Sequence, residues 1–397
     1  MRKWHAEVVA LHPFAGCLDF TARLYGPTGP LTPGSVARGE TGSSVRLPLV
    51  GDAPGMARAR LPYAVLEHAE SVWERPRDRR ILRVNLDETA TQLGVPLDDI
   101  DRVHRLAGDR PSAPLPAKAD APALLDRLAV RPDDAAEIMA GWPDPGSPLW
   151  TPELRWLLDR SVALVRADLG GHGWLPPGPE LPRERGPAWR HLYVYAYLAL
   201  TGVVMDYHRE HGIDEAVSWA ALADLGRNLA VDRRMRGEGW PVMQSWLTLH
   251  ARGAIYELGR LQYHRGGTAI DLHIPESGPM TPEAVEASLG EARAFFPRHF
   301  PDEHYTEFAC GSWLLDPQLL EYLPEDSNIV RFQRRFELDP YEEPEGLDAD
   351  VEVLRFVFRT LTTPLDQLPR RTALQRAVID HLKAGRHWRI RRGHFPI

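Results

Sequence analysis

The chain has 397 residues, 43% of them hydrophobic, which is enough for two or three domains with cores of their own. A net charge of −8, with basic residues scattered along the chain, disfavours nucleic acid as the main partner. Two cysteines, Cys17 and Cys310, without a CxxC pair argue against a disulfide framework and favour a reducing compartment.

No secretory signal is predicted from the first residues. The longest nearly uncharged apolar run, residues 192–205, is too short to span a bilayer, so it predicts a buried helix. We therefore expect a cytoplasmic protein without a membrane partner.

Residues 1–80 form an N-terminal extension in which Gly-Pro motifs such as YGPTGPLTPG separate short apolar pieces. The pieces at residues 7–12 and 45–50 predict either short strands of an appendage or an irregular arm. Both alternatives stay open.

Residues 81–170 show the apolar spacing of helices and predict a small helical domain. Thr151 and Pro152 are expected to begin one of these helices, as cap and first residue. A linker rich in Gly and Pro, residues 170–187, then predicts a domain boundary.

Two helices are expected after this linker. Residues 189–210 predict a strongly apolar helix. Ser218 is expected to cap the next helix, which should end at Gly237.

Residues 269–330 repeat one arrangement twice, namely a short strand, a polar break and a helix opened by a capping residue and a proline. The strands are predicted at residues 270–274 and 305–310. The two pairs of cap and proline are Thr281 with Pro282, and Asp316 with Pro317. Further strands are predicted at residues 246–250, 255–264, 328–338 and 351–358, and a last helix at 372–384.

From residue 187 the predicted order of elements resembles that of GNAT-type N-acyltransferases without their first strand. The segments SWAALADLGRNLAVDRRMRGEG, HIPESGPMTPEA and SWLLDPQLLEYLPEDSNIVRFQRRFEL are similar to the bacterial family of acyltransferase-domain proteins. This resemblance implies an α/β (α+β) fold. A mixed central sheet of GNAT-like topology would occupy residues 187–397, after a helical N-terminal domain at 81–170 and an irregular extension at 1–80.

The resemblance also implies a function. It points to acyl transfer from acyl-CoA, with acetyl-CoA as the default, to an amine of a small-molecule acceptor, without a metal. An alternative is a non-catalytic ligand-binding or interaction protein on the same fold. A third is transfer from an acyl carrier protein, which requires a basic docking patch. The sequence leaves the oligomeric state open.

In GNAT enzymes the CoA pyrophosphate binds backbone N–H groups of the loop between the fourth strand and third helix, in an Arg/Gln-x-x-Gly-x-Gly/Ala pattern. Here the loop at that position has one glycine, an acidic residue and two prolines, which lack the N–H donor. CoA would then bind differently, through nearby arginines for example, or not at all. The cofactor-binding candidates are Glu276, Ser277, Gly278, Met280, Thr281 and, in the later PEDSN segment, Asn328, which equally suits a turn.

N-acyl transfer needs a base for the ammonium proton, donors for the oxyanion and an acid near the thiolate. Asp271 and His273 alternate with apolar residues, so both should lie on one face of their strand. The resemblance makes His273 the base, oriented or charged by Asp271; alternatively both are solvated or pair with Arg260. Tyr322 is the candidate acid or a core aromatic residue.

Three further residues are candidates for chemistry. Cys310 and Ser312 stand at a strand end, and an acyl intermediate on Cys310 would require a lowered thiol pKa; a buried structural cysteine is the alternative. Glu257 is a second possible base or a surface residue.

The residue types also suggest a possible metal site. Its ligands would be His250, His264, Asp271 and His273, but no HxxxH pair is present, so we expect no metal.

Overall fold

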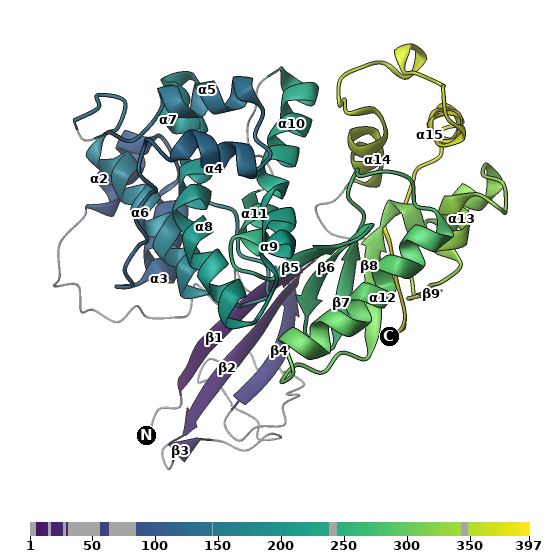
Figure 1. The fold of residues 1–397 in the computed structure, drawn as a ribbon, viewed down its shortest axis with the longest axis horizontal. Coiled ribbons are helices and arrows are strands. Elements are labelled where there is room, and N and C mark those ends of the chain that lie inside the picture. Colours follow the sequence, from purple (N-terminus) through teal and green to yellow (C-terminus); the bar gives the residue numbers. More distant parts are fainter. Residues whose placement is uncertain are drawn as a thin grey trace, which may run out of the picture. The chain divides into compact units, whose positions relative to one another are not determined.

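The protein is described by a computed structural model that covers four strands between residues 5 and 62, and residues 85–144, 146–237, 244–342 and 348–397. The chain divides into two compact units, the first formed mainly by Met1–Arg83 and the second by most of the rest. The elements are labelled in Figure 1.

The described part of the first unit is an antiparallel sheet in which the second strand pairs with the other three: β1 (His5–Phe14), β2 (Cys17–Gly26), β3 (Gly29–Pro30) and β4 (Met56–Pro62). Residues 7–12 lie within β1, so the strand alternative holds there. Residues 45–50 lie outside the described residues. The two ten-residue strands make this part of the extension more regular than predicted.

The second unit begins with helices: α2 (Leu86–Leu93), α3 (Leu97–Ala107), α4 (Ala121–Arg127), α5 (Pro132–Ala140), α6 (Pro152–Ala167), α7 (Pro187–Arg190), α8 (Leu192–Glu210), α9 (Glu215–Leu222), α10 (Asp224–Arg236) and α11 (Gln244–His250), with a 3₁₀ turn, η1 (Arg183–Arg185). Thr151 caps α6 as predicted, because its side chain accepts a hydrogen bond from the Leu154 N–H at 3.2 Å. Among the described helices, none is both long and apolar enough to cross a membrane.

The helices are followed by a six-stranded sheet with the order β5-β6-β7-β8-β10-β9. Its strands are β5 (Ile255–Leu258), β6 (Leu261–Gly266), β7 (Ala269–His273), β8 (Glu307–Ser312), β9 (Glu337–Leu338) and β10 (Arg391–Pro396). Only the β7–β8 pair is parallel among these described strands, which confirms the predicted mixed sheet. The parallel connection requires a crossover, which α12 (Pro282–His299) supplies.

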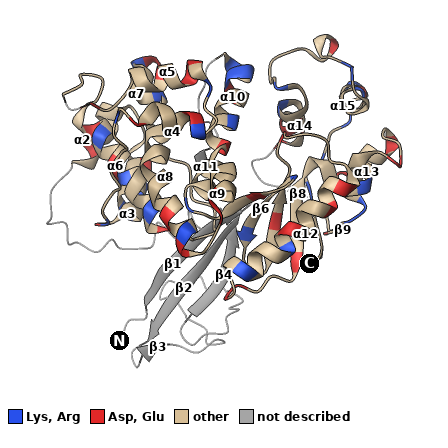
Figure 2. Cartoon of the chain, in the orientation of Figure 1, with Lys and Arg blue, Asp and Glu red and all other residues tan. Residues whose placement is uncertain are grey.

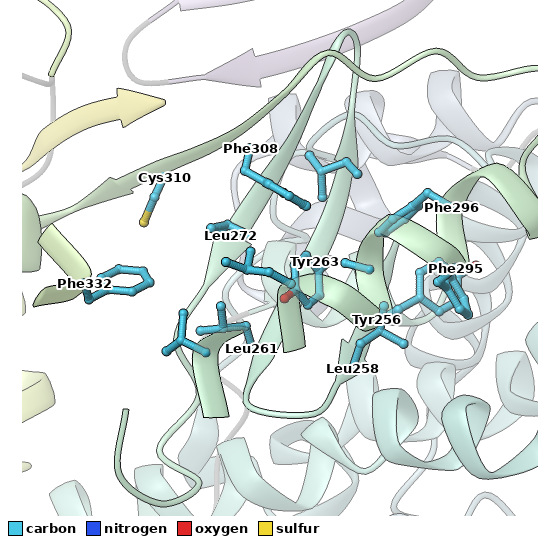
Figure 3. Close-up of a cluster of buried hydrophobic side chains, with 14 of the residues drawn as sticks. Tyr256, Leu258, Leu261, Tyr263, Leu272, Phe295, Phe296, Phe308, Cys310 and Phe332 are labelled. Carbon is cyan, nitrogen blue, oxygen red and sulfur yellow. The ribbon is translucent and has the colours of Figure 1, made fainter. Parts of the chain in front are cut away.

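The main core lies between the sheet and α12 (Figure 3). Ile270 and Leu272 of β7 are buried in this core with Phe296 of α12. Because side chains alternate along a strand, Asp271 and His273 lie on the opposite face of the sheet. That face is covered by the helical half, as the contact between His273 and Trp246 of α11 indicates.

A second apolar cluster joins the C-terminal helices to the end of the sheet and includes Leu319, Val353, Val378 and Trp388. Its elements are α13 (Asn328–Gln333), α14 (Ala349–Phe358) and α15 (Ala373–Lys383), with the 3₁₀ segments η2 (Trp313–Leu315), η3 (Pro317–Glu321) and η4 (Leu365–Gln367). The predicted last helix is confirmed.

Three predicted strands are wrong. Residues 246–250 form part of α11, where the His250 ring nitrogen Nδ1 lies 3.2 Å from the Trp246 carbonyl one turn away. Their alternating apolar residues imitate a strand because five residues barely distinguish the two periods. Residues 328–338 begin instead as helix α13, capped by Ser327, and only the last two form β9.

The third strand that was predicted wrongly, at residues 351–358, is helical. Its β-branched residues favour a strand. However, Asp348 caps α14 and Val353 is buried in the second cluster, so the helical form depends on the cap and on tertiary packing rather than on β propensity. Residues 255–264 form a hairpin rather than one strand, with Gly259 at a φ of +62° in the turn.

Ser218 does not cap a helix. Asp214 precedes the first turn of α9, and the Ser218 hydroxyl lies inside the helix, where it donates to the Asp214 carbonyl at 3.1 Å. Asp316 caps as predicted, although the segment that it opens is the 3₁₀ segment η3 rather than an α-helix.

Candidate active site

The two parallel strands at the centre of the sheet separate toward their carboxyl ends. Their pairing runs from Ala269 with Glu307 to Asp271 with Ala309. Both described strands continue beyond this last pair, β7 to His273 and β8 to Ser312. On their outer edges they remain paired, β7 with β6 and β8 with β10. The facing edges therefore present backbone donors and acceptors that the sheet itself does not use.

His273 lies at the end of β7 beside this opening. Its ring centroid is 4.6 Å from that of Trp246, edge to face, and 5.9 Å from that of His264. Its Nε2 atom is buried without a hydrogen-bond partner among the described residues. Burial lowers the pKa of His273 to about 3; His250 acts in the same direction and Asp224 opposes it. The imidazole is therefore neutral at physiological pH, and the same burial makes it a weaker base than a solvated histidine.

Asp271 shares this face of the sheet but is engaged elsewhere. Its Oδ1 atom lies 3.5 Å from Nη2 of Arg392 on β10. Burial raises the pKa of Asp271 to about 6; Arg392 lowers it and Glu307 raises it further. The sequence predicts that Asp271 orients His273, but none of the described interactions of Asp271 is with His273.

Arg260, the alternative partner predicted for Asp271 and His273, instead binds the loop after β7. It donates to the carbonyl oxygens of Pro275 at 3.0 Å and Pro279 at 3.2 Å. Arg260 therefore braces the two sides of that loop.

A buried carboxylate on α10 organises the helices above this face, and sequence reasoning missed it. Asp224 is 5% exposed. Its Oδ1 accepts from Arg227 Nε at 3.0 Å and Gln262 Nε2 at 3.1 Å. Its Oδ2 accepts from Trp246 Nε1 at 2.5 Å and Asn228 Nδ2 at 2.7 Å. We call these five residues the Asp224 cluster; it joins α10 and α11 to strand β6.

His250 is the neighbour of this cluster on α11. Its Nε2 lies 3.6 Å from Asp224 Oδ2. Burial alone would raise the pKa of Asp224, but the charges of His250 and Arg227 and the hydrogen bonds that it accepts lower it. The carboxylate is therefore ionised, and it fixes the Trp246 indole that packs on His273.

Glu257 on β5 lies at the border of the Asp224 cluster. Its Oε2 is 2.7 Å from Arg227 Nη2 and accepts from Gln262 Nε2 at 3.2 Å. Burial raises the pKa of Glu257, while Arg227 lowers it. The structure thus places this candidate base in an ion pair on the polar face of the sheet.

The loop after β7 holds most of the predicted CoA-binding residues. Ser277 and Gly278 are exposed, and Gly278 has a φ of +76°. Met280 instead is buried in the main core, and the Thr281 side chain caps α12 by accepting from the Ala284 N–H at 3.3 Å.

Glu276 in the same loop is ion-paired. Its Oε2 lies 2.8 Å from Nη2 of Arg234 and 2.8 Å from Nη2 of Arg359. The predicted repulsion between this acid and a phosphate is therefore offset by two guanidinium groups.

Four other candidates have local roles in the structure. The Cys310 thiol is buried in the main core (Figure 3), and burial raises its pKa to about 12, with Asp271 adding to the shift. This opposes the thiolate that an acyl intermediate requires. The Ser312 hydroxyl caps η2 by accepting from the Leu314 N–H at 3.1 Å. Asn328 is the first residue of α13.

Tyr322 packs against the second apolar cluster. Its hydroxyl lies 3.1 Å from His381 Nδ1 and 3.4 Å from Arg386 Nη1. None of these described contacts brings it to His273. No group of three or more His, Cys, Asp or Glu in the described part of the chain could hold a metal ion.

A mixed sheet with one splayed parallel pair and a crossover helix between its two strands is the arrangement of GNAT-like acyltransferases. Comparison with family models agrees: residues 119–253 match an N-acyltransferase N-terminal domain and residues 255–395 match a GNAT-like C-terminal domain.

Solved structures extend the match over most of the chain. An acyltransferase mutant in complex with octanoyl-CoA is 41% identical, with a TM-score of 0.73 over 79% of this chain and 100% of its own. An acyltransferase in complex with decanoyl-CoA and teicoplanin is 41% identical, with a TM-score of 0.72 over 79% and 99%. One in complex with CoA and 10C-teicoplanin is 42% identical, with a TM-score of 0.73 over the same shares.

No curated protein sequence matches the chain significantly. At this identity and coverage the chain belongs to the family of two-domain acyltransferases that join an N-acyltransferase N-terminal domain to a GNAT-like C-terminal domain. The predicted family, fold and acyl-transfer function are confirmed.

Proposed function

We propose that this chain transfers a medium-chain acyl group from acyl-CoA to an amine of a small molecule of the teicoplanin type. The observation that carries the proposal is the likeness to acyltransferases whose complexes hold octanoyl-CoA, or decanoyl-CoA with teicoplanin. The same complexes favour a medium-chain donor over the acetyl-CoA expected by default. Because acyl-CoA is a cytoplasmic metabolite, we place the reaction in the cytoplasm.

The opening between β7 and β8 fits the pantetheine arm of CoA. The arm carries two amides, and the unpaired backbone edges beyond Asp271 and Ala309 offer the donors and acceptors that amides require. The phosphate end would then lie at the loop of residues 274–281, next to the N-terminus of α12. A helix N-terminus favours anions, and Arg260 already holds this loop in place.

His273 would act as the base. The acceptor amine attacks the thioester carbonyl, a C–N bond forms, the C–S bond breaks and CoA leaves as a thiolate that takes up a proton. The buried Nε2 of His273 has no other described partner, so it can accept the amine proton. Backbone N–H groups at the end of β7 would stabilise the oxyanion.

The test is an assay of the purified full chain with octanoyl-CoA and teicoplanin. We expect release of free thiol and a product heavier than teicoplanin by one octanoyl group, detected by mass spectrometry. Calorimetry with CoA separates the alternatives. Binding without turnover on any amine would favour a non-catalytic protein, and absence of CoA binding would exclude the proposal.

A further inference from the structure

Glu276 forms ion pairs with two arginines, Arg234 and Arg359, that come from distant parts of the chain; we call them the arginine pair. Arg234 comes from α10 and Arg359 from the end of α14, and each places Nη2 2.8 Å from the same carboxylate oxygen. Figure 2 shows the basic and acidic residues on these elements. One carboxylate between two guanidinium groups leaves one positive charge unbalanced.

Arg359 is fixed in this position by its backbone and its surroundings. It ends α14 in the left-handed conformation, with a φ of 56°, which is uncommon for a residue other than glycine. Its side chain is only 16% exposed, whereas that of Glu276 is 55% exposed. The arginine is therefore held in place, and the carboxylate can turn away into water.

We propose that Arg234 and Arg359 bind a phosphate group of the acyl-CoA donor, and that Glu276 occupies the pair until the phosphate displaces it. This inference rests on the proposed function. A phosphate carries up to two negative charges, which match the two guanidinium groups, whereas the carboxylate matches only one. The pair also lies at the loop before α12, whose N-terminal end favours anions.

Two consequences follow for the donor. The arginine pair supplies the phosphate ligands that the glycine-poor loop lacks. It also discriminates between donors, because a thioester without phosphates cannot displace Glu276.

The experiment compares E276Q with wild type in the full chain. Calorimetry measures the Kd of CoA, and initial rates give KM for octanoyl-CoA and for octanoyl-N-acetylcysteamine, which has no phosphate. Removing the competing carboxylate should tighten CoA binding and lower the octanoyl-CoA KM by about two- to fivefold, the range of a partly exposed ion pair. The KM for the phosphate-free thioester should not fall with it.

E286Q is the matched control. Glu286 lies on α12, is 54% exposed and pairs with Arg335, so its substitution removes an equivalent charge and should leave CoA affinity unchanged. R234Q should weaken CoA binding about tenfold, because one charge-assisted hydrogen bond to the phosphate is lost. Arg234 is 48% exposed, so this variant should fold even if a change at Arg359 does not.

The inference would be overturned if E276Q binds CoA no more tightly than wild type, or if E286Q gains as much CoA affinity as E276Q. Neither result would contradict the proposed acyl transfer. Absence of CoA binding by wild type would instead overturn the proposed function.

Discussion

Replacing Asp224 by Asn tests whether a single buried carboxylate holds the helices to the sheet above the proposed base. The amide has the same shape but keeps only one acceptor oxygen. In either orientation its NH₂ group faces two donors, Trp246 and Asn228 on one side or Arg227 and Gln262 on the other. Two hydrogen bonds to a charged group are therefore lost.

Each such bond contributes about 1.5–3 kcal/mol. Breaking a buried charged pair by removing one partner costs about 3–5 kcal/mol. We therefore expect D224N to lower the free energy of unfolding by about 3–5 kcal/mol. Octanoyl transfer should fall as well, because Trp246 is no longer fixed against His273.

Urea unfolding followed by tryptophan fluorescence measures the loss. The matched control is D366N: Asp366 is 83% exposed on the surface, so its replacement should change stability by less than about 0.5 kcal/mol. A loss below about 1 kcal/mol for D224N would refute the role that we assign to the cluster.

Three further predictions follow from single residues. H273A should lower the rate of octanoyl transfer by about 10²- to 10⁴-fold while the Kd of CoA, measured by calorimetry, stays the same; unchanged turnover would exclude His273 as the base. The pKa of Asp271 is raised from 3.8 to about 6 in the folded state, so folding loses stability as the pH rises between these values, by about 3 kcal/mol in total. D271N should therefore be more stable than wild type at pH 8 but not at pH 4 in urea unfolding, and an equal difference at both values would contradict this. G253A should lower the melting temperature in a thermal scan, because Gly253 has a φ of +69° and an added Cβ would lie 2.6 Å from the Tyr207 ring; an unchanged melting temperature would show that the backbone relaxes.

The features that were predicted correctly are local in sequence. Thr151 and Thr281 each precede a proline and accept a hydrogen bond from the backbone three residues later. Such a cap depends on residues within one turn, so the sequence contains the whole pattern. The strand around Ile270 and Leu272 was recognisable for the same reason, because its alternation is complete within five residues.

The features that were missed depend on contacts between distant residues. In the sequence, Asp224 looks like an ordinary acidic residue of a helix. Its hydrogen-bond partners Trp246 and Gln262, however, lie on another helix and on a strand. Likewise, α14 is rich in β-branched residues, and its helical form depends on burial of Val353 against the C-terminal helices. The signal that could have indicated the Asp224 cluster is the set of polar residues, such as Gln262 and His273, on the face of adjacent strands that the core does not use.

That polar face explains why the candidate site lies between the two halves of the second unit. In a sheet with one solvated face, Gln262, His264 and His273 would be surface residues. Here the helices exclude water from them, so each needs a partner from the helical half, and burial of their polar atoms costs free energy where none is found. Gln262 donates a hydrogen bond to Asp224, and His264 Nε2 lies 2.7 Å from the carbonyl oxygen of His172. Among the described residues, His273 packs on the rings of Trp246 and His264, and its buried Nε2 atom has no hydrogen-bond partner. We therefore expect the acceptor amine at this atom.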